Sequence, residues 1–575
     1  MKKTILFILI ALLIQNITAQ ELKLSKTDSV IFNAMRDEMD RSMKEYKHPE
    51  AGSFFYIMYQ IDDGQNLSVT AELGSIIDCE KKDFRSWGYR IMLGDYNCND
   101  ENFVSSSNDY DYSMSESINI PLGDDYIGIR RALWNMTEMS FESCVRSYID
   151  KTTYFKENPL KKPAIPDFTK SDPVTCLKNS SVGMLEQKQA EDLVKKLSRI
   201  FRNYEKINES MVSFQQIKIN IYMLSTEGVM CKIPMDYSIV SINAGIVNDS
   251  IPDNSHYESL SFYEEDPAVF LTKIDQMVQS SKNLAEYIMS IDNLEEISEN
   301  YTGPVILSDF ASSRFFYNSL FGNEKKLFAE RAPVYENSKY NFSQNKSTME
   351  EKIGTTVISD KFTIICKPKL TQFGNKNLFG ATSIDKDGIV PPEEIILIKD
   401  GKLKTLLHDR VPTDSIYLSN GHRRFGVSNS SSVNMMAPSN LFVYYSGAKD
   451  KNVLKSGLIE LCKENDLDYG IEIRSLDSTA DESPYVYYKI DLAGKETRIK
   501  PLSYPRAGFK TLNKVKDCTS DMSTVNMMLG DNYSGLGFDT GFNYGLNGCF
   551  VSVIAPSAVL LKDVEINWKH TGMWE

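Results

Sequence analysis

Apolar residues recur at helical spacing in three stretches of the first half of the chain. In residues 27–46 one face carries Val30, Ile31, Met35, Met39 and Met43, which predicts an amphipathic helix. Residues 126–148 and 186–204 predict two further helices. Short strand-like runs lie around them at residues 54–60, 67–77, 89–93, 217–223 and 237–244. The first half is therefore expected to mix helices and strands.

After about residue 300 the pattern changes to short apolar runs separated by glycines. In residues 394–408, Asp400-Gly401 separates two such runs and predicts a hairpin, because a type I′ turn needs positive φ at both central positions. A glycine-rich stretch at 535–548 leads into a final strand pattern at 551–566. We predict an α+β protein, with a mixed α/β region at residues 20–300 and a β-rich region at residues 301–575.

The first 19 residues have the pattern of a signal peptide. Lys2 and Lys3 precede the apolar residues 5–14, and Thr18-Ala19 offers a small-residue cleavage site. This apolar stretch is shorter than the roughly 20 residues that cross a bilayer, and no later stretch is long enough. We expect cleavage near Ala19 and an exported protein, periplasmic or extracellular, without a membrane span.

Composition excludes several classes of function. The 575 residues carry a net charge of −14 without a basic block, which argues against binding to nucleic acid. The nine cysteines are scattered and form no C-x-x-C pair, so a zinc ribbon is not expected, while one or two disulfides stay open. The five histidines form no H-E-x-x-H pair, and phosphate-loop, Rossmann and G-x-S-x-G motifs are absent. The residue pattern alone singles out no active site.

Several segments, taken in order, resemble the TldD/PmbA (TldD/TldE) metallopeptidase family, in its exported branch. They are residues 90–103, 301–316 (YTGPVILSDFASSRFF), 381–391 (ATSIDKDGIVP) with the Asp400-Gly401 hairpin, 419–424 (SNGHRR), 437–443 (APSNLFV) and 554–566. This resemblance covers nearly the whole mature chain. It implies the family's metallopeptidase-like fold and a link to proteolysis.

The same resemblance locates a departure from the family's zinc motif. Family peptidases carry H-E-x-x-x-H here, with two zinc-binding histidines and a glutamate that activates water. In this chain Asn318 and Asn323 fall at the histidines and Ser319 at the glutamate, while Tyr544 falls at the third ligand, a cysteine, with Cys549 slightly later. Carboxamides are weak zinc ligands, and serine is no replacement for a carboxylate base. We therefore expect no catalytic residue and no cofactor; zinc would bind only if other residues supply the ligands.

A structural role also accounts for this segment. Residues 308–323 predict a helix that Ser308 or Asp309 caps and that packs Phe316, Leu320 and Phe321 against a sheet. Whether the chain is itself an enzyme stays open at this point.

Three hypotheses follow. The favoured one is an inactive, TldE-like partner of a zinc-bearing TldD-like subunit, or a homodimer, that helps to degrade unfolded peptides. The second is an active peptidase with an atypical site around Cys549, His422 or His408. The third is an envelope protein that binds peptides or glycans, suggested by 30 Tyr and 28 Phe.

Overall fold

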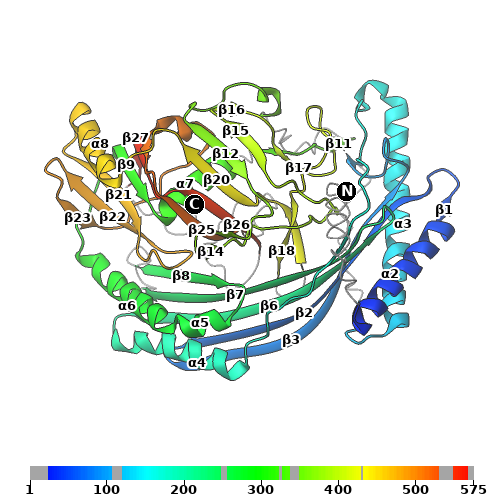
Figure 1. Cartoon of the computed structure of the whole chain (residues 1–575), viewed down its shortest axis with the longest axis horizontal. Helices are drawn as coiled ribbons and strands as arrows, with labels where there is room; N and C mark the ends of the chain where they lie inside the picture. Colours follow the sequence, from blue (N-terminus) through cyan, green and yellow to red (C-terminus); the bar gives the residue numbers. More distant parts are fainter. Residues whose placement is uncertain are drawn as a thin grey trace, which may run out of the picture.

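Four long strands form the base of the molecule in the computed structural model, which describes residues 24–105, 119–247, 255–322, 327–336, 349–428, 432–529 and 548–567 (Figure 1). The strands are β2 (Gly52–Glu72), β3 (Ser75–Leu93), β6 (Glu209–Ser225) and β7 (Met230–Ile246). They pair antiparallel in the order β3-β2-β6-β7. The short β1 (Lys47–His48) joins β2, and both β5 (Thr175–Leu177) and β8 (His256–Glu264) join the free side of β7.

The prediction of separate short strands at residues 54–60 and 67–77 was wrong. The polar residues between them resemble a turn, but they continue β2 because β3 and β6 pair with them on both sides. Gly64 lies in this part of the strand, where a Cβ would meet the Phe84 ring at 2.5 Å. The absence of a side chain at Gly64 therefore makes room for the Phe84 ring. The chain turns later, at Leu73 and Gly74, which both have positive φ.

The two faces of this sheet pack against different layers. Four helices cover one face: α2 (Lys26–Glu45) and α3 (Tyr126–Glu157) at one end, α4 (Gln187–Ser198) and α6 (Ile274–Ser290) at the other (Figure 1). The short α5 (Ala268–Thr272) precedes α6. The other face packs against the C-terminal region, with Met58, Ile219 and Met235 in contact with a cluster that includes Phe379 and Phe550. Period-2 alternation along each strand separates these two sets of side chains.

The predicted helices of the first half are confirmed, with longer or shorter ends. In α2 the side chains of Ile31, Met35 and Met39 are buried, and Ser25 caps the helix by accepting the Asp28 N–H at 3.0 Å. The helix predicted at 126–148 continues to Glu157 in α3, and the one predicted at 186–204 ends as a 3₁₀ turn after Ser198.

The C-terminal region contains two six-stranded sheets with helix α7 (Phe310–Phe321) between them (Figure 1). The first has the order β16 (Lys402–Leu403), β15 (Ile395–Lys399), β12 (Phe362–Cys366), β20 (Asn440–Tyr445), β26 (Cys549–Pro556), β25 (Met522–Leu529). The second has the order β23 (Glu496–Ile499), β22 (Tyr485–Asp491), β21 (Tyr469–Ser475), β9 (Tyr301–Ser308), β27 (Ala558–Ile566), β24 (Val515–Cys518). Helix α8 (Lys451–Glu464) packs on the second sheet.

Short strand pairs complete the region. They are β4 (Phe103–Val104) with β11 (Val334–Tyr335), β10 (Phe328–Ala329) with β17 (Leu407–His408), β13 (Gln372–Phe373) with β14 (Lys376–Asn377), and β18 (Arg423–Val427) with β19 (Ser432–Met436). Helices and mixed sheets together confirm the predicted α+β class.

The strand predictions for this region were right in type and partly wrong in extent. Asp400 and Gly401 have φ of 49° and 73°, as the predicted hairpin turn between β15 and β16 requires. The single strand predicted at 551–566 is instead two strands, because the chain crosses from one sheet to the other at Ser557, whose N–H donates to Asp521 O. The predicted glycine-rich stretch lies outside the described residues, except for Gly548.

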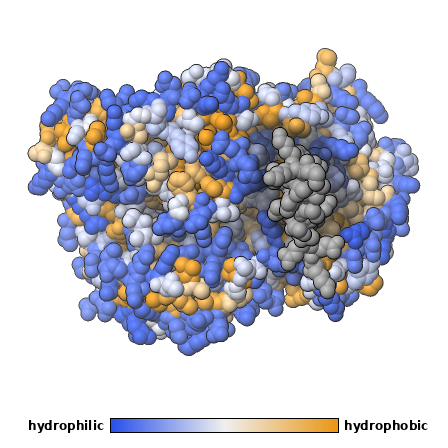
Figure 2. All heavy atoms as spheres, in the orientation of Figure 1, coloured by the Kyte–Doolittle hydropathy of each residue, from blue (hydrophilic) through white to orange (hydrophobic). Residues whose placement is uncertain are grey.

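The visible face of the molecule is mostly hydrophilic, with apolar side chains in scattered groups (Figure 2). Within the described residues, no helix has both the length and the apolar character needed to cross a membrane. Residues 1–19, predicted as a signal peptide, lie outside the described part of the chain.

Candidate functional site

Helix α7, which holds the segment aligned with the family's zinc motif, begins without a capping side chain of its own. Asp309 has a positive φ of 58°, and the Ser308 hydroxyl donates to Glu472 at 3.0 Å instead of capping the helix. The Phe310 N–H is satisfied by Ser475 Oγ at 3.0 Å. The predicted cap by Ser308 or Asp309 was therefore wrong, because a neighbouring strand supplies the acceptor for this buried helix end.

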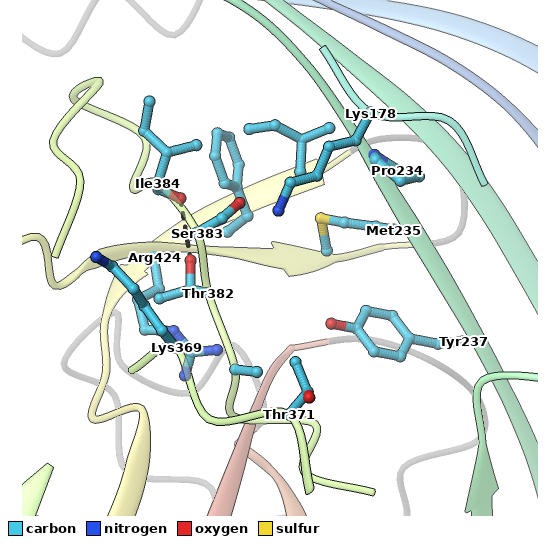
Figure 3. Close-up of a pocket in the computed structure, with 13 residues that line it drawn as sticks. Lys178, Pro234, Met235, Tyr237, Lys369, Thr371, Thr382, Ser383, Ile384 and Arg424 are labelled. Atoms are coloured by element: carbon cyan, nitrogen blue, oxygen red, sulfur yellow. Dashed lines mark hydrogen bonds between the residues drawn. The ribbon is translucent and has the colours of Figure 1, made fainter. Parts of the chain in front are cut away.

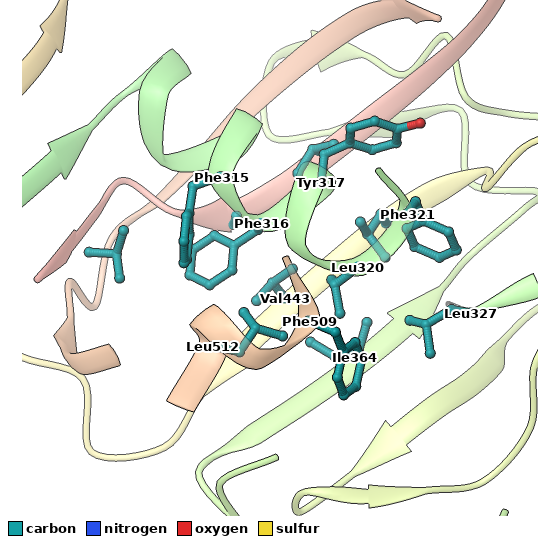
Figure 4. Close-up of a cluster of buried hydrophobic side chains, with 14 of the residues drawn as sticks. Phe315, Phe316, Tyr317, Leu320, Phe321, Leu327, Ile364, Val443, Phe509 and Leu512 are labelled. Atoms are coloured by element: carbon teal, nitrogen blue, oxygen red, sulfur yellow. The ribbon is translucent and has the colours of Figure 1, made fainter. Parts of the chain in front are cut away.

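The body of α7 is part of the largest apolar cluster of the C-terminal region (Figure 4). The predicted packing of Phe316, Leu320 and Phe321 is confirmed, and none of the three is more than 1% exposed. Val443 of one sheet and Val305 of the other belong to the same cluster. The helix therefore fills the space between two sheets with hydrocarbon and aromatic rings.

The aligned motif positions bring no ionisable group to α7. Ser319 is 2% exposed, and its hydroxyl has no hydrogen-bond partner among the described residues. Asn318 is partly buried, and Asn323 lies outside the described residues. The expectation that these three positions have lost zinc binding and base catalysis stays a prediction.

The residues described do not fit a catalytic zinc ion. In the described ranges, no group of three His, Cys, Asp or Glu side chains lies close enough together to hold a metal. The Cys549 thiol is buried and donates to Phe425 O at 3.3 Å, and burial raises its pKa, which disfavours the thiolate that zinc binds. Tyr544 lies outside the described residues. We therefore assign no zinc-dependent reaction to the described residues.

His408 and His422, which the hypothesis of an atypical site names, are both buried beside Asn420. His408 Nδ1 donates to Ala329 O at 2.9 Å, while its Nε2 has no partner within the described part of the chain. His422 contacts Asn420 O at 3.0 Å and Ser439 Oγ at 3.2 Å. Burial, and then the nearby Arg424, lowers the pKa of His422 to about 3, so this imidazole stays neutral. Both rings are fully buried, and their contacts explain a structural role.

A set of buried ion pairs joins the N-terminal sheet to the family-like segments. Asp387 accepts from Arg90 of β3 at 2.8 Å and from Arg423 at 3.2 Å. Arg410 pairs with Glu227, in the turn between β6 and β7, at 2.7 Å. We call Arg90, Glu227, Asp387, Arg410 and Arg423 the charged layer. Asp387 and Arg410 are almost completely buried, and the surrounding arginines lower the pKa of Asp387 against the effect of burial.

The loop at residues 381–391 owes its shape to Asp385. This carboxylate accepts the N–H groups of Asp387 and Ile389, each at 2.9 Å, and that of Arg423 at 3.3 Å. Gly388 has a φ of 79°, and a Cβ there would lie 2.6 Å from Val229, in the turn between β6 and β7. The two segments 381–391 and 419–424, which carry the family resemblance, therefore hold the two regions together.

A cavity of about 330 Å³ lies beside the charged layer, between β7 and the loop at residues 381–384 (Figure 3). The labelled side chains around it include Lys178, Lys369, Arg424 and Tyr237. The sequence alone does not reveal this cavity, because its lining residues come from five separate parts of the chain. The only signal was the resemblance of segments 381–391 and 419–424, which supply one wall.

Comparisons with known proteins agree with this architecture. A sequence profile of the PmbA/TldA metallopeptidase C-terminal domain matches residues 304–567. The fold is similar to that of a candidate modulator of a DNA gyrase from Thermotoga maritima, at 14% identity and a TM-score of 0.53, covering 94% of this chain and 99% of that one. It is also similar to TldE from Thermococcus kodakarensis, at 10% identity and a TM-score of 0.54, covering 93% and 100%.

Curated protein sequences give no match. The profile match carries the family assignment, and the solved structures extend the similarity of fold to almost the entire chain. The resemblance predicted from the sequence is thereby confirmed. The C-terminal domain of the chain, residues 304–567, belongs to the PmbA/TldD family.

Proposed function

We propose that this protein is an exported, non-catalytic subunit that resembles TldE and works with a zinc-bearing relative in degrading unfolded peptides. The observation that carries the proposal is the chemistry of α7. Where family peptidases place two histidines and a glutamate, the described positions hold Asn318 and the buried Ser319, whose hydroxyl has no hydrogen-bond partner in the described part of the chain. The apolar packing of this helix supports a structural role.

The proposed partnership follows the pairing of subunits in this family. TldD and TldE proteins act as partner subunits, and the fold of this chain is similar to that of a TldE. In such a pair, the zinc-bearing subunit would hydrolyse the peptide, and this chain would shape the groove and stabilise the assembly. A homodimer is the other arrangement consistent with the family.

The test is reconstitution with a zinc-bearing family member from the same genome. The mature chain, beginning at Gln20, is mixed with that relative, and the molar mass and the hydrolysis of an unfolded peptide are measured. We expect a complex of defined mass and a hydrolysis rate above that of the relative alone, while this chain alone gives no hydrolysis. If neither mass nor rate changes, the proposal is wrong.

Export has its own test. The protein is expressed with its first 19 residues, and the N-terminus of the product outside the cytoplasm is sequenced. We expect Gln20 as the first residue. A cytoplasmic product that keeps Met1 would contradict export.

A second candidate function, binding of a small ligand without hydrolysis, is favoured by the cavity between β7 and the loop at residues 381–384. This function requires no metal and no partner subunit.

A further inference from the structure

The cavity lies against a part of β7 that has a neighbouring strand on one side only. Strand β5 pairs with β7 up to Lys232, and β8 pairs with it from Ser238 onward. Between them, residues 233–237 pair only with β6 within the described part of the chain. Ile233, Pro234, Met235 and Tyr237 from this interval line the cavity.

The polar part of the cavity wall is cationic and rich in hydroxyl groups (Figure 3). Its charged residues are Lys178, Lys369 and Arg424, and its hydroxyl-bearing side chains include Thr371, Thr382 and Ser383. Among the described residues, no Asp or Glu lines it. Lys369 pairs with Glu393 at 2.9 Å, but that carboxylate is 80% exposed, so the pair is weak and screened by solvent.

Arg424 is a buried cation of the cavity wall. It is 3% exposed, and its Nη1 donates to the backbone oxygens of Pro438 and Phe550 at 2.5 and 2.7 Å. Its Nε has no hydrogen-bond partner, and no carboxylate pairs with it in the described ranges. A buried guanidinium without a counter-charge is strongly unfavourable. The neighbouring Arg423 and Arg410, by contrast, each have a carboxylate partner.

We propose that this cavity binds a compact oxyanion, with Arg424 as its buried anchor and Lys178 and Lys369 at its mouth. Guanidinium and ammonium groups form their strongest hydrogen bonds with carboxylates and phosphates. The oxyanion is carried either by the C-terminal carboxylate of a short peptide or by a free small anion. Met235 and Phe425, on the apolar wall, would contact the body of the ligand. The cavity volume of about 330 Å³ fits the lower end of small-molecule sites.

The first experiment compares three probes by isothermal titration calorimetry on the mature chain at low ionic strength. They are acetylated trialanine with a free carboxylate, the same peptide as its C-terminal amide, and inorganic phosphate. We expect the peptide acid or phosphate to bind and the amide not to bind. Preference for the peptide acid identifies a peptide terminus as the source, and preference for phosphate identifies a free anion. Binding of none of the probes, or equal binding of acid and amide, overturns the proposal.

The second experiment uses variants of the lining residues. Lys178→Gln combined with Lys369→Gln removes two cations from half-exposed or exposed positions and should leave the fold intact. We expect a loss of affinity of about tenfold, because each exposed ionic contact contributes up to about one factor of ten. Lys282→Gln, on α6 against the opposite face of the sheet, is the matched control and should bind like the wild type. An equal loss in both, or in neither, contradicts the site.

Arg424→Gln tests the anchor itself and should abolish binding of the probe anion. Because Arg424 also donates to two backbone oxygens, the melting temperature of the Arg424→Gln variant is measured as well. Arg424→Lys serves as the conservative variant. We expect Arg424→Lys to bind more weakly than the wild type but measurably. A folded Arg424→Gln that binds with wild-type affinity rules out the anchor. The site requires no zinc-bearing partner, so its failure and the failure of the proposed function are separate results.

Discussion

Helix α7 buries phenylalanine and leucine between two sheets, whereas the charged layer buries arginine and aspartate between two regions of the chain. Phe316 is surrounded by apolar side chains of the C-terminal cluster. Asp387 is just as buried, yet it is held by Arg90 and Arg423. Both places lie in segments that resemble the same family, but only α7 corresponds to the catalytic motif.

The difference shows which parts of the family pattern are needed for folding. The catalytic positions of α7 can carry neutral side chains because the helix is held by packing, which does not depend on those positions. The charged layer has less freedom, since removing the charge of Asp387 takes a counter-charge away from buried surroundings, even though Arg90 also pairs with Glu101 at 2.6 Å. Helix α7 therefore tolerates the neutral Asn318 and Ser319 at the positions that align with the zinc motif, whereas the loop at residues 381–391 depends on its paired charges.

The largest expected effect comes from α7. Phe316→Ala should lower the free energy of unfolding by about 4 kcal/mol, because it leaves a cavity in a close-packed core. Urea unfolding followed by tryptophan fluorescence gives this value. Phe373→Ala, at a 36% exposed position, is the matched control and should cost much less. Equal costs would mean that α7 is not a packing element.

In the charged layer, replacing one carboxylate by an amide should lower the free energy of unfolding almost as much. Asp387→Asn is expected to cost about 3 kcal/mol, because Arg423 and Arg90 would lose a shared counter-charge in a buried place, although Arg90 would keep its pair with Glu101. The same unfolding measurement applies. Asp192→Asn removes an exposed helical pair with Lys188 and should give no measurable change. A neutral result for Asp387→Asn would show that the layer contributes little to stability.

A smaller effect should appear as a pH dependence. The pKa of His422 is lowered from 6.5 to about 3 in the folded chain, so below pH 6.5 the unfolded chain takes up a proton that the folded chain does not. The stability that depends on neutral His422 is therefore complete above pH 6.5 and is lost as the pH falls toward 3.

The measurement compares the unfolding midpoints of wild type and His422→Gln from pH 7 to pH 4. The wild type should lose roughly 3 kcal/mol more than the variant over this range. His48→Gln, on the short strand β1, should follow the wild type. Parallel curves for wild type and His422→Gln would contradict a buried, neutral imidazole.

The smallest effect is expected at the position aligned with the catalytic base. Ser319→Ala should lower stability by less than about 0.5 kcal/mol, because the buried hydroxyl has no hydrogen bond to lose within the residues that the structure describes. Ser312→Ala on the same helix is the control and should cost about 1 kcal/mol, since its hydroxyl donates to Pro556 O at 2.7 Å. A clear loss of stability or of assembly in Ser319→Ala would reveal a role that the structure does not explain.

The sequence was informative wherever local chemistry decides the outcome. The spacing of Ile31, Met35 and Met39 predicted α2, and Asp400-Gly401 predicted a turn with two positive φ angles. The packing of Phe316 was also predictable, because an apolar helix next to a strand pattern has few other places to bury its rings. The family resemblance rested on the order of several segments, and each segment alone was weak.

The sequence was misleading or uninformative where residues far apart in the chain determine the local structure. Gly64 lies in a run that looks like a turn, but pairing on both sides keeps it in β2. The cap of α7 comes from Ser475, far along the chain, which no local pattern signals. The cavity was likewise hidden, because Lys178 and Arg424 meet only through the packing of the two regions.

The zinc content of the purified mature protein shows whether this chain holds a metal without the family's two histidines. The protein is dialysed against metal-free buffer, and its zinc is measured by elemental mass spectrometry alongside a zinc-bearing family member treated in the same way. The account predicts near-zero zinc in this chain and about one zinc per chain in the relative. One tightly held zinc per chain here would contradict the account and make an active peptidase, with ligands other than Asn318 and Asn323, the better explanation.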